Sequence, residues 1–252
     1  MAKIISVHSF RGGTGKSNIT ANLAALLAAS GRRIGVVDTD IQSPGIHILF
    51  GVDEASVAHS LNDYLWGRCD IQQAAIDVTT QAGAAIEGRI FLIPSSMKSG
   101  EIARILREGC DARVLTSGFR KLIKTLDLDI LLIDTHPGLN EETLLSIALS
   151  HALVMIMRPD QQDYAGTAVA LEVATALNVP RLLMCVNKVL PVFEPESVRA
   201  QVAQTFDCEV AAVIPHSDEM MLLASAGIFA LRYPDHPIST ILGHVSARLL
   251  AE

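Results

Sequence analysis

The stretch Phe10-Arg11-Gly12-Gly13-Thr14-Gly15-Lys16-Ser17 is the part of the sequence that most strongly indicates the fold and the kind of ligand. It follows the apolar run 4–7 and opens a helix-like stretch that continues to Ser30. A glycine-rich turn between a strand and a helix is the context that a phosphate-binding loop requires. Glycines let backbone N–H groups point inward at an anion, and the helix N-terminus adds partial positive charge.

Two side chains of this loop carry chemistry that glycine cannot supply. Lys16 can reach the β- and γ-phosphates of a nucleotide, and the Ser17 hydroxyl can coordinate magnesium. The usual pattern GxxxxGK[ST] has glycine at the position of Phe10, so its strict form fails by one residue. The alternative is a glycine-rich turn that binds no ligand. This alternative is strongly disfavoured, because the sequence GGTGKS lies between a predicted strand and a predicted helix. The predicted nucleotide-binding residues of the loop are Gly12, Gly13, Thr14, Gly15, Lys16, Ser17 and Asn18.

Short apolar runs alternate with helical patterns along the rest of the chain. Such uniformly apolar runs are typical of strands covered on both faces. Their alternation with helices predicts an α/β fold with one mostly parallel twisted sheet flanked by helices on both faces. Residues 42–88 are the least regular, and we expect surface helices and loops there within one domain, 1–252. The strand runs are 4–7, 34–37, 90–93, 130–133, 153–157, 182–186 and 210–214, and the helical segments lie near 99–109, 113–126, 140–150, 161–178 and 196–205.

Composition narrows the class of protein. A net charge of −7 disfavours a surface that grips nucleic acid everywhere, but it leaves room for a local basic patch. The N-terminus lacks the features of a signal peptide, and no apolar run is long enough to span a bilayer. The four cysteines form no CxxC pair, so we expect buried, reduced thiols in a cytoplasmic protein, with nucleoid association as one option. They are Cys69, Cys110, Cys185 and Cys208.

Aspartates follow two of the predicted strands. Asp38 and Asp40 come after the run 34–37, and Asp134 comes directly after the run 130–133. Ligands of open α/β sheets bind outside the carboxyl ends of the strands, and a carboxylate there can hold magnesium directly or through water. The alternative is that these aspartates only cap the next turn. Ser17, Asp38 and Asp134 are the predicted metal ligands.

Three segments together resemble the MinD/ParA family of deviant Walker A ATPases, which are SIMIBI-class P-loop NTPases. They are the phosphate loop, Asp38-Thr39-Asp40 as a first switch, and Asp134-Thr135-His136-Pro137-Gly138 as a second. The family signature KGGxGK[ST] has lysine where this chain has Arg11. In that family the nucleotide lies between two subunits, and this residue reaches the partner's phosphates. Arg11 either acts as an arginine finger in trans or replaces the lysine poorly.

The resemblance implies a slow ATPase that uses ATP and Mg²⁺. Asp38 and Asp40 would position magnesium-bound and attacking waters, Asp134 would support the metal, and Gly138 would let the second switch move. His136 is either a base or a loop histidine without a role. The predicted catalytic residues are Lys16, Asp38, Asp40 and Arg11.

The resemblance also places the base of the nucleotide late in the chain. Asn187 ends a predicted strand, and Pro215 ends the last one, so both are candidates for the adenine pocket. Asn187-Lys188-Val189-Leu190 lacks the aspartate of the guanine signature NKxD, which disfavours guanine.

Four biological roles remain open. The first is a ParA-like ATPase whose ATP-bound homodimer holds nonspecific DNA and positions a plasmid, a chromosome locus or a carboxysome-like body, with an adaptor protein that stimulates hydrolysis. The second is a MinD-like regulator of division-site placement that cycles on membrane. The third is a metal or electron carrier similar to the nitrogenase iron protein, which needs paired cysteines, whereas Cys110 stands alone. The fourth is a scaffold without turnover.

Two segments bear on these roles. Within residues 98–124, seven cations oppose three acids, which indicates either a phosphate-contacting surface or a solvated helix face. The apolar residues of segment 238–250 fit one helical face with few cations nearby, so we expect core packing, and membrane docking is disfavoured. The cations are Lys98, Arg104, Arg107, Arg113, Arg120, Lys121 and Lys124, and the acids are Glu101, Glu108 and Asp111. The apolar residues are Ile238, Ile241, Leu242, Val245, Leu249 and Leu250.

Overall fold

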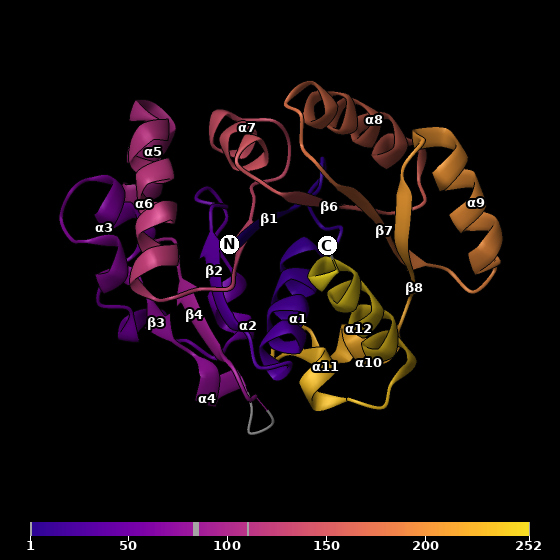
Figure 1. Ribbon diagram of the computed structural model, residues 1–252, viewed down its shortest axis with the longest axis horizontal. Helices are drawn as coiled ribbons and strands as arrows, with labels where there is room; N and C mark the ends of the chain where they lie inside the picture. Colours follow the sequence, from indigo (N-terminus) through magenta and orange to yellow (C-terminus); the bar gives the residue numbers. More distant parts are fainter. Residues whose placement is uncertain (1, 83–85, 110, 252) are drawn as a thin grey trace.

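The computed structural model, which describes residues 2–82, 86–109 and 111–251, has a sheet between two layers of helices (Figure 1). In these residues the sheet has eight strands in the order β3-β4-β2-β5-β1-β6-β7-β8. Neighbouring strands are parallel except β3 and β4. The strands are β1 (Lys3–His8), β2 (Arg33–Asp38), β3 (Ile76–Asp77), β4 (Arg89–Ile93), β5 (Ile130–Asp134), β6 (Ala152–Met157), β7 (Leu182–Val189) and β8 (Glu209–Pro215).

The seven apolar runs of the sequence all form strands. Every residue of β5 and β6 is buried, which is what helices on both faces of a parallel sheet produce. The predicted α/β architecture, a mostly parallel sheet with helices on either side, is therefore confirmed.

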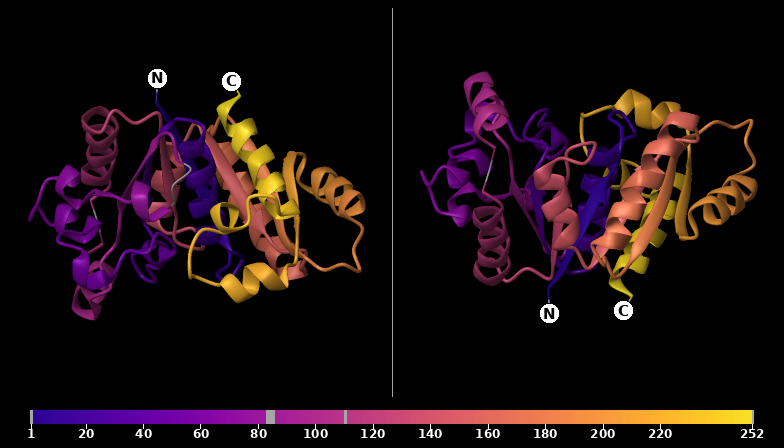
Figure 2. Two further views of the ribbon diagram at one scale, coloured as in Figure 1. Left: turned by 90° about the horizontal axis from the view of Figure 1, so that it is seen from below. Right: turned by 90° about the horizontal axis from the view of Figure 1, so that it is seen from above.

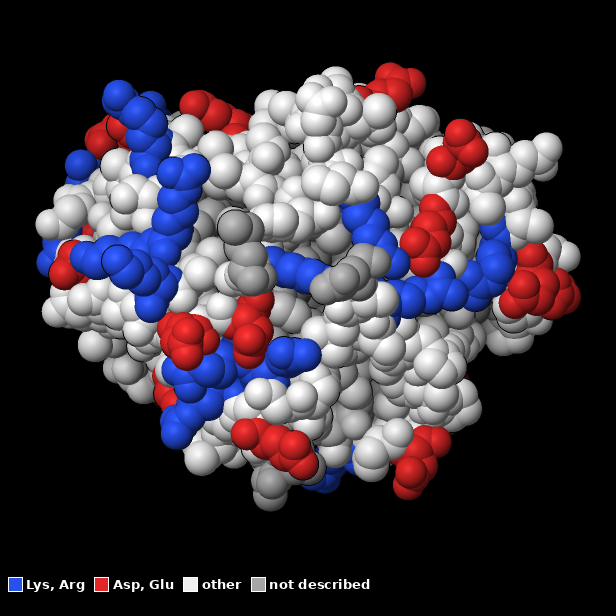
Figure 3. Space-filling model, in the orientation of Figure 1, with Lys and Arg blue, Asp and Glu red and all other residues white. Residues whose placement is uncertain are grey.

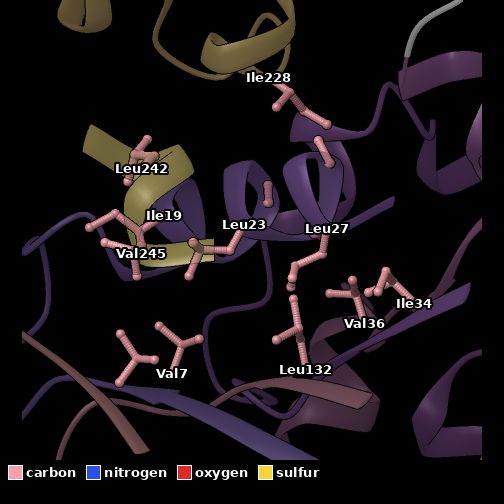
Figure 4. Packing of buried hydrophobic residues seen from close by; sticks show 14 of the residues in the cluster. Val7, Ile19, Leu23, Leu27, Ile34, Val36, Leu132, Ile228, Leu242 and Val245 are labelled. Carbon is pink, nitrogen blue, oxygen red and sulfur yellow. The ribbon is translucent and has the colours of Figure 1, made fainter. Parts of the chain in front are cut away.

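One face of the sheet is covered by α1, which is buried on nearly all sides. Its leucines Leu23 and Leu27 lie in one hydrophobic cluster with β-strand residues such as Val36 (Figure 4). The last helix lies beside α1 on the same face (Figure 2). The helices of this layer are α1 (Lys16–Ala29), α2 (Ile46–Leu49), α4 (Thr79–Ala82), α10 (Asp218–Leu223), α11 (Phe229–Arg232) and α12 (Pro237–Leu250).

The prediction for the C-terminal segment is confirmed. Ile238, Leu242, Val245 and Leu249 of α12 are buried in the cluster around α1, and Ile241 and Leu250 pack against it. The apolar face of α12 therefore belongs to the protein core.

Two further clusters lie on the other side of the sheet. One involves α3 and α6, and the second lies beneath α7, α8 and α9. The helices on this side are α3 (Leu61–Leu65), α5 (Ser99–Glu108), α6 (Ala112–Thr125), α7 (Glu141–Ala148), α8 (Gln161–Ala176) and α9 (Pro195–Phe206).

Residues 42–88 differ from the prediction of surface helices and loops. They contain β3, which extends the sheet by pairing Ile76 with Leu92 of β4, and the short 3-10 helices η1 (Glu54–Ser56) and η2 (Ile71–Ala74). Phe50 and Leu61 are fully buried, so this segment contributes to the core. A strand of two residues and helices of three to five residues are too short to leave a periodic pattern in the sequence.

The strand order decides where the functional side chains meet. β1 lies beside β5, and β5 lies beside β2, so the segments that follow these strands lie at one edge of the sheet. In this register Asp134 is the partner of Val7 on one side and of Asp38 on the other. The phosphate loop and both aspartate segments are thereby brought together.

Candidate functional site

The phosphate loop has the backbone that its glycines permit. Gly13 has φ +77° and Gly15 has φ +94°, in the left-handed region that favours glycine. Gly15 is the N-cap of α1, and a Cβ there would lie 2.5 Å from Nδ2 of Asn187. Glycine at position 15 is therefore required by both conformation and space.

The end of β7 holds the carbonyl side of this loop. Asn187 Nδ2 donates to the Thr14 carbonyl at 2.8 Å, and Lys188 Nζ donates to the Gly13 carbonyl at 2.8 Å. In a trans peptide the carbonyl and the following N–H point in opposite directions. The N–H groups of Thr14 and Gly15 therefore face away from β7, at the start of a helix, where an anion binds well.

Lys16 is the meeting point of the three segments. Its Nζ lies 2.8 Å from Asp134 Oδ1, 4.0 Å from Asp40 Oδ2 and 3.5 Å from Ser17 Oγ. Thr20 donates to the same Asp134 Oδ1 at 3.0 Å. Sequence reasoning missed Thr20, although its position one helical turn after Lys16 puts both side chains on the same face of α1.

The three strand-end aspartates are buried, and the nearest positive charge is the single ammonium group of Lys16. Asp38 accepts hydrogen bonds from the backbone N–H of Asp40 at 3.0 Å and of Gly45 at 3.3 Å. Burial, and next the Asp134 carboxylate, raises the pKa of Asp38 well above its usual value. Among the described residues, the buried Asp134 Oδ2 has no hydrogen-bond partner. Carboxylates that share one ammonium group and leave a buried oxygen unpaired suit an additional cation.

The donor set fits magnesium held jointly with phosphates. Within the described part of the chain, no three histidine, cysteine or acidic side chains form a metal cage. Magnesium is usually bound by one or two carboxylates together with waters and substrate phosphates. Ser17 in the first turn of α1, with Asp38 and Asp134, matches that pattern.

Asp40 and His136 join the two switch segments. His136 Nδ1 lies 2.6 Å from Asp40 Oδ1, which also accepts from the backbone N–H of Ser43 at 3.2 Å. The other carboxylate oxygen, Oδ2, faces Lys16. The Asp40 carboxylate is therefore fixed by two donors on one side and presented to the phosphate loop on the other.

His8 is a buried histidine that sequence reasoning missed. Its Nδ1 lies 2.8 Å from the hydroxyl of Thr135, which itself donates to the Val7 carbonyl. Nδ1 must therefore carry the proton, and Nε2 has no partner among the described residues. Burial lowers the pKa of His8 to about 3, with smaller contributions from Lys16 and His136. This histidine is therefore neutral. Because it ends an apolar strand as a single polar residue, no sequence pattern marked it as part of the site.

The two unusual residues at the start of the loop lie towards α8. The ring of Phe10 packs against Gly166, where a Cβ would overlap it. Arg11 is 46% exposed, and its Nε lies 3.8 Å from Asp163 Oδ1, whose main partner is Arg158. Arg11 is thus placed at the periphery of the site, whereas Lys16 lies at its centre.

A pocket of about 200 Å³ opens beside the loop. It brings together Asn187 and Pro215, the two residues that the sequence proposed for the adenine pocket, and it adds Asn18 of the phosphate loop. Part of its wall comes from α10, with Met220 and Met221, which sequence reasoning did not foresee. The Asn187 side chain also supports the phosphate loop, so it serves both the loop and the pocket.

The cysteines do not all follow the prediction of buried thiols. Cys185 is buried, and burial raises the pKa of its thiol to about 12. Cys69 and Cys208 are only partly buried, because each lies at the margin of a hydrophobic cluster. Cys110 lies outside the described residues.

A parallel sheet with a glycine loop opening its first helix, a central lysine and strand-end aspartates defines a P-loop NTPase. The ParA family model, described as NUBPL iron-transfer P-loop NTPase, matches residues 1–250, and the chain belongs to this family. P-loop NTPases act on nucleotide with magnesium, and ATP and Mg²⁺ are the ligands of this site.

Individual relatives cover much of the chain. An uncharacterized ATP-binding protein of Methanocaldococcus jannaschii is 28% identical over 99% of this chain and 88% of its own length. An iron-sulfur cluster carrier protein of Methanococcus maripaludis is 29% identical over 71% of this chain and 59% of its own. The septum site-determining protein MinD of Pyrococcus horikoshii, complexed with Mg-ADP, has a TM-score of 0.81 at 23% identity, over 99% of this chain and 96% of that one. At that identity the likeness concerns the fold.

Proposed function

We propose that this protein is a slow ATPase switch whose ATP-bound homodimer holds nonspecific DNA and positions an intracellular cargo. One observation carries the switch. Lys16 in the phosphate loop contacts Asp134 and lies 4.0 Å from Asp40, so both switch segments converge on the group that meets the γ-phosphate. A change at the γ-phosphate would therefore be felt by both segments.

The hydrolysis step uses the same residues. The Gly13–Lys16 amides and the Lys16 ammonium hold the β- and γ-phosphates, and Ser17, Asp38 and Asp134 would hold magnesium, which neutralises phosphate charge. A water oxygen forms a bond to the γ-phosphorus as the bond from that phosphorus to the bridging oxygen breaks. The water proton passes to the Asp40 carboxylate and from there to the released phosphate. The products are ADP and phosphate.

Dimerisation is supported by the exposure of Arg11. Its half-exposed side chain lies beside the phosphate loop, from which a long guanidinium could extend to a second subunit. An arginine supplied in trans would stabilise the charge that develops at the transferred phosphoryl group. Nucleotide would then control whether two copies of the chain remain together.

The DNA surface is supported by the basic patch on α5 and α6, where lysines and arginines gather (Figure 3). Some of its cations are already paired, as in Arg104–Glu108, Arg113–Asp111 and Lys121–Asp70. Arg120 and Lys124 have no acidic partner among the described residues and lie on one exposed face of α6. A dimer would present this face twice, which strengthens binding to a polyanion.

Membrane cycling is less well supported. The apolar face of α12 packs in the core, and in the described residues no helix has both the length and the apolar character needed to cross a bilayer.

An iron-sulfur carrier is the second candidate, because the family description names iron transfer and a relative is named as a carrier. Iron and sulfide content after anaerobic reconstitution would test it directly.

Sedimentation and DNA-cellulose chromatography test the proposal. We expect a monomer in ADP, a dimer in a slowly hydrolysed ATP analogue, and retention on DNA only in ATP. Arg120→Glu should elute at lower salt, because the loss of a phosphate contact weakens binding to DNA. Each lost contact should also make the plot of the logarithm of the binding constant against the logarithm of salt concentration less steep by about 0.9. Arg232→Glu, the same charge change at an exposed position of α11, is the control. Retention that is absent or insensitive to salt would contradict the DNA role, and a monomer in the analogue would contradict the switch.

A further inference from the structure

The Asp40 carboxylate has two differently engaged oxygens. Oδ1 receives His136 Nδ1 at 2.6 Å and the Ser43 N–H at 3.2 Å, while Oδ2 faces Lys16 at 4.0 Å. A carboxylate whose one oxygen accepts from two donors cannot rotate freely about its Cβ–Cγ bond, so its other oxygen keeps a constant direction. That direction is towards the ammonium group of the phosphate loop.

His136 is itself anchored. The carbonyl of His136 accepts a hydrogen bond from the Thr143 hydroxyl at 3.2 Å, and Thr143 lies in the first turn of α7, which Asn140 caps. The residues that follow His136 are Pro137 and Gly138, and the Gly138 N–H donates to the Ser9 carbonyl at 3.3 Å. The imidazole therefore extends from a segment that is hydrogen-bonded both to α7 and to Ser9, the residue between β1 and the phosphate loop.

We propose that His136 is a positioning residue for hydrolysis, holding Asp40 Oδ1 through its Nδ1–H so that Oδ2 meets the attacking water. The inference rests on the proposed ATPase function and adds a specific residue to it. Because Asp40 Oδ1 is an acceptor, the Nδ1 atom of His136 must be the donor. His136 touches neither water nor phosphate in this role, and it acts only through Asp40.

This role predicts an order of activity among substitutions. Asparagine places an amide N–H close to where Nδ1 stands, whereas glutamine places it one bond further out. We expect His136→Gln to lower kcat about 100-fold, because a small misplacement of a catalytic group has effects of that size. His136→Asn should keep most of the parental kcat. The dissociation constant for the ATP analogue should stay unchanged in both variants.

A double-mutant cycle separates positioning from general stabilisation. In the Asp40→Asn background, His136→Gln should cause no further loss of kcat, because the group through which it acts is already changed. His244→Asn, on an exposed part of α12, is the matched histidine control and should keep parental kcat. Phosphate release and isothermal titration of the ATP analogue are measured for each variant. If His136→Gln does not fold, His136→Ala takes its place in the cycle.

Each outcome decides the matter. A parental kcat in His136→Gln, an equally slow His136→Asn, or an undiminished further loss in the Asp40→Asn background would overturn the positioning role. Parental enzyme that releases no phosphate would instead contradict the proposed ATPase function. The slow glutamine variant, the rescued asparagine variant and the silent double variant together would establish the role.

Discussion

The ring of Phe10 occupies the space that a side chain at position 166 would need. Phe10 stands where the usual phosphate loop has glycine, and Gly166 lies on α8, so an unusual residue in the loop is matched by a small one in the neighbouring helix. The aromatic ring packs against α8, next to the cluster beneath α7, α8 and α9. The loop tolerates phenylalanine because the facing helix makes room for it.

Gly166→Ala should lower the free energy of unfolding by about 1–3 kcal/mol, because the added methyl group overpacks against Phe10. Gly243→Ala is the matched control, since nothing lies near a Cβ there. Alanine in that open helix position should raise stability by about 0.5–1 kcal/mol. Urea unfolding measures both, and Phe10→Ala combined with Gly166→Ala should recover much of the loss. Equal midpoints for the two single variants would contradict this packing relationship.

Asp40→Ala should lower the rate of phosphate release far below the parental rate and retain binding of ATP. The carboxylate lies near Lys16 but belongs to neither the loop amides nor the predicted magnesium ligands, so the triphosphate keeps its main contacts. With hydrolysis blocked, ATP itself should hold the dimer for as long as the analogue does in the parent. Sedimentation in ATP and a phosphate-release assay check this. Parental turnover in the variant would show that Asp40 has no part in the reaction.

Arg11 should act across the dimer. Arg11→Ala and Asp40→Ala should each hydrolyse ATP far more slowly than the parent, but a mixture of the two should regain activity. In a mixed dimer the Arg11→Ala subunit supplies an intact Asp40, and its partner supplies Arg11 to that site. Arg11→Lys should retain activity if positive charge is the main requirement. A mixture no more active than its components would mean that Arg11 acts within its own chain or has no role.

His8 should make the protein sensitive to acid. Its pKa is about 3 in the folded chain and about 6.5 when unfolded, so the unfolded chain binds one more proton between these values. The free energy of unfolding should therefore fall by about 1.4 kcal/mol for each pH unit below 6.5 from this group, and not change above it. Urea titrations at pH 7 and pH 5 should show a smaller difference in His8→Asn than in the parent. His244→Asn should keep the parental difference.

The sequence predicted those parts of the site that lie within contiguous motifs. Lys16 and Ser17 were found because a glycine-rich turn between a strand and a helix is typical of phosphate binding, and Asp134 because it directly follows a wholly apolar run. The sequence also placed Asp38 and Asp134 at the carboxyl ends of strands, but only the structure shows that these strands are neighbours and that the two residues are partners. Their roles as ligands and catalysts remain predictions for the experiments above.

The parts that could not be predicted depend on contacts between distant segments. Asp40 and His136 are 96 residues apart, and their hydrogen bond depends on strand order and on two side-chain rotamers. Two elements are too short to give a periodic signal in the sequence. They are the helix α10, which lines the predicted base pocket, and the strand β3. His8 ends an apolar strand, where a single polar residue has no pattern to reveal its partner Thr135.

The hydrogen bonds from Asn187 and Lys188 to the loop carbonyls have a thermodynamic consequence. The protein itself orders the backbone of Gly13 and Thr14, so the conformational entropy of that turn is already lost before a triphosphate arrives. Nearly all of the attraction between amides and phosphate then contributes to affinity. Preorganisation of this kind lets a small cluster of glycines act as a rigid receptor.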